Sequence, residues 1–138
     1  MEKLDNILQD TEKALMQLNR ALQEKFSDIV RDAAIQRFEF TFELFWKLVK
    51  TYLNYVEGID CYSPKNCFRE LLPILLASED EVELLLKMCD HRNLISHVHD
   101  EEISNEVFNT VPSYYNLMYV ILSRIKAKYK ELHKKHSV

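Results

Sequence analysis

Apolar residues recur at helical spacing along nearly the whole chain. In the first stretch they stand three, four or seven positions apart, which predicts an amphipathic helix over about residues 2–25: Leu4, Ile7, Leu8, Leu15, Leu18 and Leu22. We find no alternation of apolar and polar residues with the period of two that is typical of a strand. The pattern therefore favours an all-helical fold.

Capping residues mark where the next helices begin and end. Ser27 and Asp28 can cap a second helix that runs to about residue 57, where Gly58 is a typical stop. Ser63-Pro64 places a capping side chain just before proline, and this pair predicts the start of a shorter third helix.

Two further helices complete the chain. Ser78 with Glu81 three positions later is a capping box, which predicts a fourth helix that frays near residues 95–99. Asp100 can cap a last helix that reaches the mid-130s. Long helices with short connections pack antiparallel, so we expect an up-and-down bundle of four main helices and one short helix.

Two prolines lie inside these helical patterns. Pro73 and Pro112 each lack a backbone N–H, and we expect both to kink or break the helix in which they stand.

The second helix has an unusually wide apolar face. Its polar residues gather in one narrow sector: Glu39, Glu43, Lys47, Lys50 and Asn54. The apolar side spans about 200°, wider than the roughly 100° that a surface helix needs: Phe38, Phe42, Phe45, Trp46, Leu48, Val49, Tyr52, Leu53 and Val56. Such a face fits either a central helix inside its own bundle or a helix that also meets a second copy of the protein.

Composition narrows the class of protein. A chain of 138 residues with one Gly and three Pro is long enough for a single domain, residues 1–138, and leaves little room for Gly-rich phosphate loops. The sequence has no apolar run of membrane-spanning length, and its first residues are too charged for a signal peptide. The three cysteines form no Cys-x-x-Cys pair, which predicts free thiols in a reducing cytoplasm.

The stretch HRNLISHVHD, residues 91–100, carries the candidate chemistry. Arg92 can bind a phosphate through two N–H groups, and His97 supplies an imidazole, the type of side chain that commonly moves protons near neutral pH. Together they suit attack by an RNA 2′-hydroxyl on the adjacent phosphate, a reaction that needs no metal. In a continuous helix the two side chains would point about 140° apart, so they can converge only if the helix ends between them or if Arg92 reaches across with its long side chain.

Two other interpretations of this stretch remain open. His97, His99 and Asp100 could share a metal ion, although no further ligand stands at a recognisable spacing, so we expect no metal or other cofactor. The three histidines, His91 included, could also be ordinary polar residues at a helix C-terminus, where positive charge suits the helix dipole.

Three motifs in the chain resemble the HEPN superfamily, and within it the branch of nucleotidyltransferase substrate-binding proteins. IQRFEFTFELFWKLVKTYL (residues 35–53) is similar to the signature of that branch's second helix. SPKNCFRELL (63–72) is similar to its third-helix opening, and RNLISHVHDEE (92–102) to the superfamily's Arg–His motif. They occur in the family order, and the resemblance covers essentially the whole chain.

The resemblance implies a helical bundle that forms a homodimer around a shared cleft, with a separate small nucleotidyltransferase as partner. It implies a metal-independent endoribonuclease toxin that leaves a 2′,3′-cyclic phosphate and is neutralised by that partner. Arg92 would hold the scissile phosphate of RNA, His97 would act as general acid and base, and Asn93 would orient them. In some family pairs the partner attaches AMP to a tyrosine two residues after the motif His, but this chain has His99 there.

The same branch supports a second interpretation, in which the protein is a non-catalytic subunit that binds a nucleotide or another small acceptor for the nucleotidyltransferase. A third is a helical interaction module without a working site. Net charge is −4, and residues 79–102 carry eight acids against Lys87 and Arg92, an unattractive field for RNA. The C-terminal stretch is basic and could follow a phosphate backbone or simply suit the helix dipole: Arg124, Lys126, Lys128, Lys130, Lys134 and Lys135.

Overall fold

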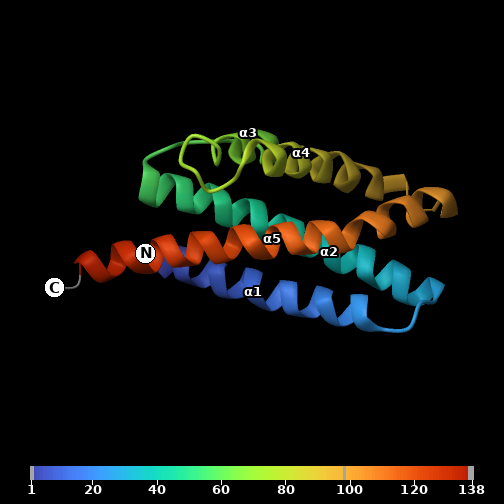
Figure 1. Ribbon diagram of the computed structural model, residues 1–138. Helices are drawn as coiled ribbons and strands as arrows, with labels where there is room; N and C mark the ends of the chain where they lie inside the picture. Colours follow the sequence, from blue (N-terminus) through green and yellow to red (C-terminus); the bar gives the residue numbers. More distant parts are fainter. Residues whose placement is uncertain (1, 98, 137–138) are drawn as a thin grey trace.

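The chain folds into an antiparallel bundle of four long helices with one short helix. The computed structural model describes residues 2–97 and 99–136, without the side chains of residues 133, 135 and 136, and within this part it contains no strand. The helices are α1 (Glu2–Gln23), α2 (Asp28–Tyr52), α3 (Pro64–Arg69), α4 (Glu79–Asn93) and α5 (Glu101–His136). In Figure 1, α1, α2, α4 and α5 alternate in direction along the length of the bundle. The predicted all-α architecture is confirmed.

The predicted helix starts of α2 and α3 are confirmed by their capping bonds. The hydroxyl of Ser27 accepts a hydrogen bond from the backbone N–H of Val30, and that of Ser63 accepts one from Asn66. A π-helical turn, η1 (Leu53–Glu57), extends α2 and ends at Gly58, whose φ of 67° lies in the left-handed region that glycine adopts without strain.

The starts of α4 and α5 are confirmed in the same way. The Ser78 hydroxyl accepts from the N–H of Glu81, while the Glu81 carboxylate accepts from the N–H of Ser78. The Asp100 carboxylate accepts from the N–H groups of Glu102 and Ile103 at the start of α5. Between them α4 passes into a 3₁₀ turn, η2 (Leu94–His97), where fraying was expected; residue 98 of that expected range lies outside the described residues.

The two prolines have different outcomes. Pro73 lies in the turns that follow α3, so the helical pattern does end before it. Pro112 lies inside α5, which continues through it for 36 residues in all, so the expected break does not occur there. Proline at this position removes one hydrogen bond of the helix, which leaves room for a bend without ending the helix. The first turns of α5 are inclined to the rest of the helix in Figure 1.

The wide apolar face of α2 is buried within its own chain. Phe38, Phe42 and Phe45 are at most 1% exposed, although they stand on a helix that we considered for contact with a second copy. The Phe38 ring stacks on Tyr114 of α5 at 5.9 Å, and the Phe45 ring packs against Phe68 of α3 at 5.6 Å. The central-helix interpretation therefore accounts for the face, and these aromatic rings are not available to a dimer interface.

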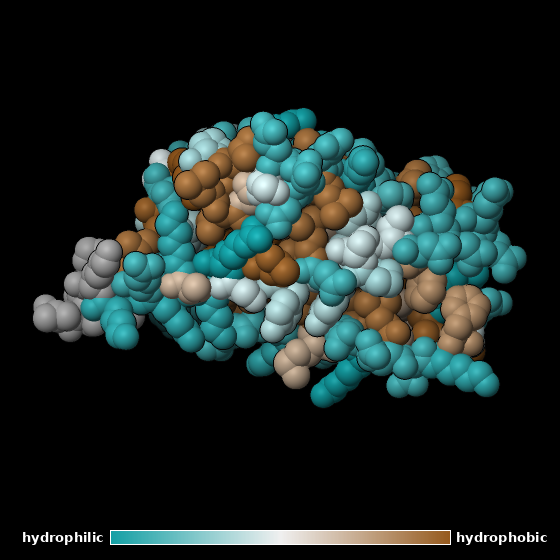
Figure 2. Space-filling view, viewed as in Figure 1, coloured by the Kyte–Doolittle hydropathy of each residue, from teal (hydrophilic) through white to brown (hydrophobic). Residues whose placement is uncertain are grey.

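The outer surface mixes apolar and charged side chains. Figure 2 shows apolar side chains gathered where the layer of α3 and α4 meets α5, with hydrophilic side chains around them. Of the helices in the described part of the chain, none combines the length and the apolar character that crossing a membrane requires.

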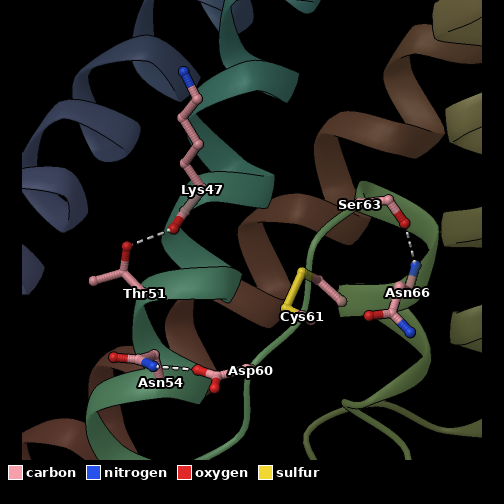
Figure 3. The surroundings of a disulfide bond; sticks show 8 residues. Lys47, Thr51, Asn54, Asp60, Cys61, Ser63 and Asn66 are labelled. Atoms are coloured by element: carbon pink, nitrogen blue, oxygen red, sulfur yellow. Dashed lines mark hydrogen bonds between the residues drawn. A yellow bond between two sulfur atoms is a disulfide. The ribbon is translucent and has the colours of Figure 1, made fainter.

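The cysteines differ from the sequence-based prediction. Cys61 and Cys67 form a disulfide, with Cα atoms 5.2 Å apart, and only Cys89 is free. The loop after Gly58 turns into α3 at Ser63, and this turn brings together two cysteines that have no recognisable spacing in the sequence (Figure 3). Because disulfides form mainly in oxidising compartments, the cysteines no longer support the predicted cytoplasmic location.

We expect Phe45→Ala to lower the free energy of unfolding by about 3–5 kcal/mol, because the ring is fully buried and its removal leaves a cavity. Phe40→Ala is the matched control on the same helix, since Phe40 is 59% exposed and its loss should change stability by less than about 0.5 kcal/mol. Urea unfolding followed by circular dichroism measures both. Equal losses in the two variants would contradict the central position of α2.

Candidate functional site

A groove of about 410 Å³ lies between α2, the start of α3 and the last turn of α4. Its lining residues come from all three of the motif-bearing stretches: Phe42, Glu43, Trp46, Ser63, Pro64, Lys65, Cys89, Arg92 and Asn93. We call it the Arg92 groove. Segments far apart in the sequence thus contribute to one concave surface, which is typical of a small-molecule site.

Arg92 is held against α2 by two contacts. Its Nη2 donates a hydrogen bond of 2.6 Å to Oε1 of Glu43, and the guanidinium carbon lies 5.8 Å from the centre of the Phe42 ring. The other carboxylate oxygen of Glu43 accepts from the indole N–H of Trp46 at 3.2 Å. Glu43 therefore fixes the positions of both Arg92 and Trp46.

One donor of Arg92 is left without a partner. Its Nε is buried and forms no hydrogen bond with any residue in the described chain. A buried donor without a partner costs about 1–3 kcal/mol, and most buried polar groups in proteins are paired. The Arg92 side chain as a whole is a third exposed, so its guanidinium can be reached from the groove. A ligand oxyanion that draws the guanidinium toward it can accept a hydrogen bond from Nε and so remove the free-energy cost of the unpaired donor.

The charge of the groove is mixed. Two cations, Arg92 and Lys65, face one carboxylate, Glu43. Lys65 also forms an ion pair of 2.7 Å with Asp90, which lies on α4 outside the lining. An anionic ligand can therefore compete with Glu43 for Arg92, and the groove suits a small ligand with one or two negative charges.

The structure brings together only part of the predicted site. Asn93 lines the Arg92 groove beside Arg92, but neither His97 nor His99 is among the described residues that line it. Both histidines are exposed, His97 at the end of η2, and their ring centroids are 6.3 Å apart. Arg92 and His97 therefore do not face one shared pocket within a single chain.

The described part of the chain contains no cluster of side chains that would support the metal interpretation. Nowhere among those residues do three His, Cys, Asp or Glu side chains gather closely enough to hold an ion. Asp100, the third proposed ligand beside His97 and His99, uses its carboxylate to cap α5.

His91 has a structural role. Its Nδ1 lies 2.5 Å from the hydroxyl of Tyr114, and its Nε2 lies 3.9 Å from a carboxylate oxygen of Glu106. Burial raises the pKa of Tyr114, so this hydroxyl stays protonated over the physiological range. His91 thus joins α4 to α5, in agreement with the ordinary interpretation of this histidine.

The basic C-terminal stretch is partly used inside the molecule. Lys126 pairs with Glu12 of α1, and Lys128 pairs with Glu57 of η1. Arg124 donates to Glu81 of α4 and holds the pKa of that carboxyl below its usual range. These pairs fasten α5 to the other helices, and they reduce the charge available to a phosphate backbone; the side chain of Lys135 lies outside the described part.

Sequence reasoning missed Glu43, Trp46 and Lys65 as groove residues. The signal was present, because Glu43 belongs to the narrow polar sector of α2 and Lys65 directly follows the Ser63-Pro64 cap. A polar strip opposite the buried face of a helix marks a side of that helix that can reach a ligand.

Comparisons with known proteins identify relatives. Residues 6–127 match the family described as nucleotidyltransferase substrate binding protein like. One similar solved structure is the crystal structure of ttk003001694 from Thermus thermophilus, whose sequence is 41% identical to this chain. The two folds superpose with a TM-score of 0.80, and the match covers 83% of this chain and 98% of that one.

A second solved structure shares the fold at lower identity. HI0074 from Haemophilus influenzae, described as revealing the fold of a substrate binding domain of a nucleotidyltransferase, is 23% identical with a TM-score of 0.64. The match covers 91% of this chain and 98% of that one. A search of curated proteins found no significant match.

Cys89 should be a poor nucleophile although it lines the groove. Burial raises the pKa of its thiol to about 11, so the thiolate fraction at pH 8 is roughly 100-fold below that of an ordinary cysteine. We expect slow alkylation by iodoacetamide in the native protein, with a rate that still rises with pH above 9. Mass spectrometry of the alkylated chain measures it.

The same experiment on unfolded protein checks the disulfide. Without reductant one thiol per chain should react, and after reduction all three cysteines should react. Three reactive thiols before reduction would show that Cys61 and Cys67 are not joined.

Proposed function

This chain belongs to the family of nucleotidyltransferase substrate-binding proteins, and from this premise we propose that it is the non-catalytic, substrate-binding subunit of a two-part nucleotidyltransferase. In this role the Arg92 groove holds a small anionic acceptor, and a separate nucleotidyltransferase protein supplies the transferred nucleotide. The partner is inferred from the family.

The buried, unpaired Nε of Arg92 is the observation that carries the proposal. Arg92 sits in a groove of about 410 Å³, within the range of roughly 300–1,000 Å³ found for small-molecule sites. A phosphate or carboxylate that binds there gains charge-assisted hydrogen bonds from the guanidinium, which the protein itself leaves partly unused. Lys65 and Asn93 offer further donors on the same rim.

The ribonuclease interpretation has less support. It requires Arg92 and His97 to act on one phosphate, whereas only Arg92 lines the groove in the chain. The acidic stretch around α4 also repels RNA, and the basic residues Lys126 and Lys128 are ion-paired. A nuclease site built by two copies stays a prediction that rests on the resemblance to HEPN proteins.

The homodimer is likewise a prediction of the resemblance. With the α2 rings buried inside the chain, an interface must use other side chains, such as Phe26, Ile29 and Phe40, which are 58%, 82% and 59% exposed. Light scattering at micromolar concentration should give twice the chain mass of 16.5 kDa. A mass equal to one chain would exclude both the homodimer and a cleft shared by two copies.

Substitution of Arg92 tests the groove. We expect calorimetry with nucleoside monophosphates, sugar phosphates and small carboxylates to identify a ligand whose affinity falls about 10- to 100-fold in Arg92→Ala, the equivalent of one charge-assisted contact. The affinity for this ligand should also fall at least about 10-fold in Arg92→Lys, because lysine lacks the planar pair of donors. Glu43→Gln should bind an anion at least as tightly as the wild type, since it removes the competing carboxylate.

Arg20→Ala is the matched control, because Arg20 is an exposed arginine on α1 outside the groove. His97→Ala should bind like the wild type. A ligand affinity that is unchanged in Arg92→Ala contradicts the proposal. Cleavage of single-stranded RNA in EDTA to a 2′,3′-cyclic phosphate, lost in His97→Ala, would restore the ribonuclease interpretation instead.

A further inference from the structure

A second cavity, of about 350 Å³, lies on the other side of Trp46 from the Arg92 groove. Its walls are the first turns of α1, the C-terminal half of α2 and the loop at residues 60–62 that leads to α3. Figure 3 shows part of this wall, with Lys47 and Thr51 on α2, Asn54 on η1, and Asp60 and Cys61 on the loop. We call it the loop cavity.

The loop cavity is electropositive in an acidic protein. Lys3, Lys47 and Lys50 line it, and within the described chain none of their ammonium groups forms an ion pair, in contrast to Lys65 with Asp90. The single carboxylate of the lining, Asp60, accepts a hydrogen bond of 2.6 Å from the side chain of Asn54. Three cations against one carboxylate, in a chain of net charge −4, attract an anion to this concave surface.

Aromatic rings accompany the lysines. Tyr55 and Tyr62 are 51% and 78% exposed, and Trp46 is half-buried at the boundary with the Arg92 groove. The ammonium of Lys50 lies 5.8 Å from the centre of the Trp46 ring and 5.9 Å from that of Tyr62. Exposed aromatic rings beside cations are the combination that binds the base and the phosphate of a nucleotide.

The loop that carries Tyr62 is held in place before any ligand arrives. The disulfide between Cys61 and Cys67 ties it to α3, and the Ser63 cap and the Asn54–Asp60 hydrogen bond add two further anchors (Figure 3). A surface tyrosine on an unrestrained loop would lose conformational entropy on binding, and this loop has already lost most of it on folding. The cavity is therefore pre-formed.

We propose that the loop cavity is a nucleotide-binding site, with the phosphates at Lys3, Lys47 and Lys50 and the base against the ring of Tyr55 or Tyr62. A volume of about 350 Å³ is at the low end of the range for small-ligand sites, so it fits one nucleotide rather than a strand of RNA. The proposal goes beyond the acceptor role of the Arg92 groove and does not depend on it.

Trp46 is the only tryptophan of the chain and lines both cavities, so its fluorescence reports a ligand in either one, and the variants below assign the cavity. We expect titration of the full chain with ADP to give a saturable change, confirmed by calorimetry. Tyr62→Ala should weaken ADP binding roughly 5- to 150-fold, the range for loss of one stacked ring. Lys50→Gln should weaken it at least about 5-fold and make the remaining binding less sensitive to salt.

The control variants replace a tyrosine and a lysine that lie outside the loop cavity. Tyr119→Ala removes a tyrosine that is 54% exposed on α5, and Lys87→Gln removes an exposed lysine on α4; both should bind ADP like the wild type. Arg92→Ala is measured beside them to tell the two cavities apart, because Arg92 lines only the Arg92 groove. Thermal midpoints of all variants confirm that each remains folded.

Three results would overturn the proposal. The first is no saturable ADP binding at millimolar concentration by folded protein. The second is ADP binding that Arg92→Ala weakens and that Tyr62→Ala and Lys50→Gln leave unchanged, which would place the nucleotide in the Arg92 groove. The third is binding of a single-stranded oligonucleotide more tightly than ADP with the same dependence on Tyr62, which would mean a strand-binding surface.

Discussion

The burial of the aromatic side of α2 is the constraint on which the rest of the structure depends. A helix with so wide an apolar side must be covered by several neighbours, and α1, α3 and α5 all pack against it. In the C-terminal half of α2 the strip that carries Glu43, Lys47 and Lys50 reaches the surface, and this strip forms a wall of both cavities. The same requirement that builds the core thus decides where a ligand can approach the most central helix.

The helix boundaries could be predicted because they depend on neighbouring residues. Ser27, Ser63, Ser78 and Asp100 each bond a backbone N–H two or three positions ahead, and a local contact of this kind is visible in the sequence. Pro112 shows the limit of local reasoning, since α5 continues through it. Packing of both halves of this helix against the bundle outweighs the loss of one hydrogen bond.

The candidate site could be predicted only in part, because its contacts join distant segments. The sequence identified Arg92 and Asn93 but could not show that Arg92 meets Glu43, 49 positions earlier. A helix end between Arg92 and His97 was expected to allow the two side chains to converge; α4 does end there, but the 3₁₀ turn of η2 leaves His97 exposed outside the groove. The disulfide was missed for a different reason: Cys61 and Cys67 become neighbours through the turn into α3 at Ser63, and a separation of six positions is no recognised pairing signal.

The position of that disulfide links ligand binding to thiol chemistry. Cys61 lines the loop cavity, and its bond to Cys67 holds the loop that carries Tyr62. Binding and oxidation are thermodynamically linked. If the disulfide raises the affinity for a ligand by some factor, the bound ligand raises the equilibrium constant for forming the disulfide by the same factor. The fraction of protein with a ligand in the cavity then depends on the redox potential of the surroundings. A protein of this kind would retain its ligand differently in an oxidising and in a reducing compartment, with no change in any residue that contacts the ligand.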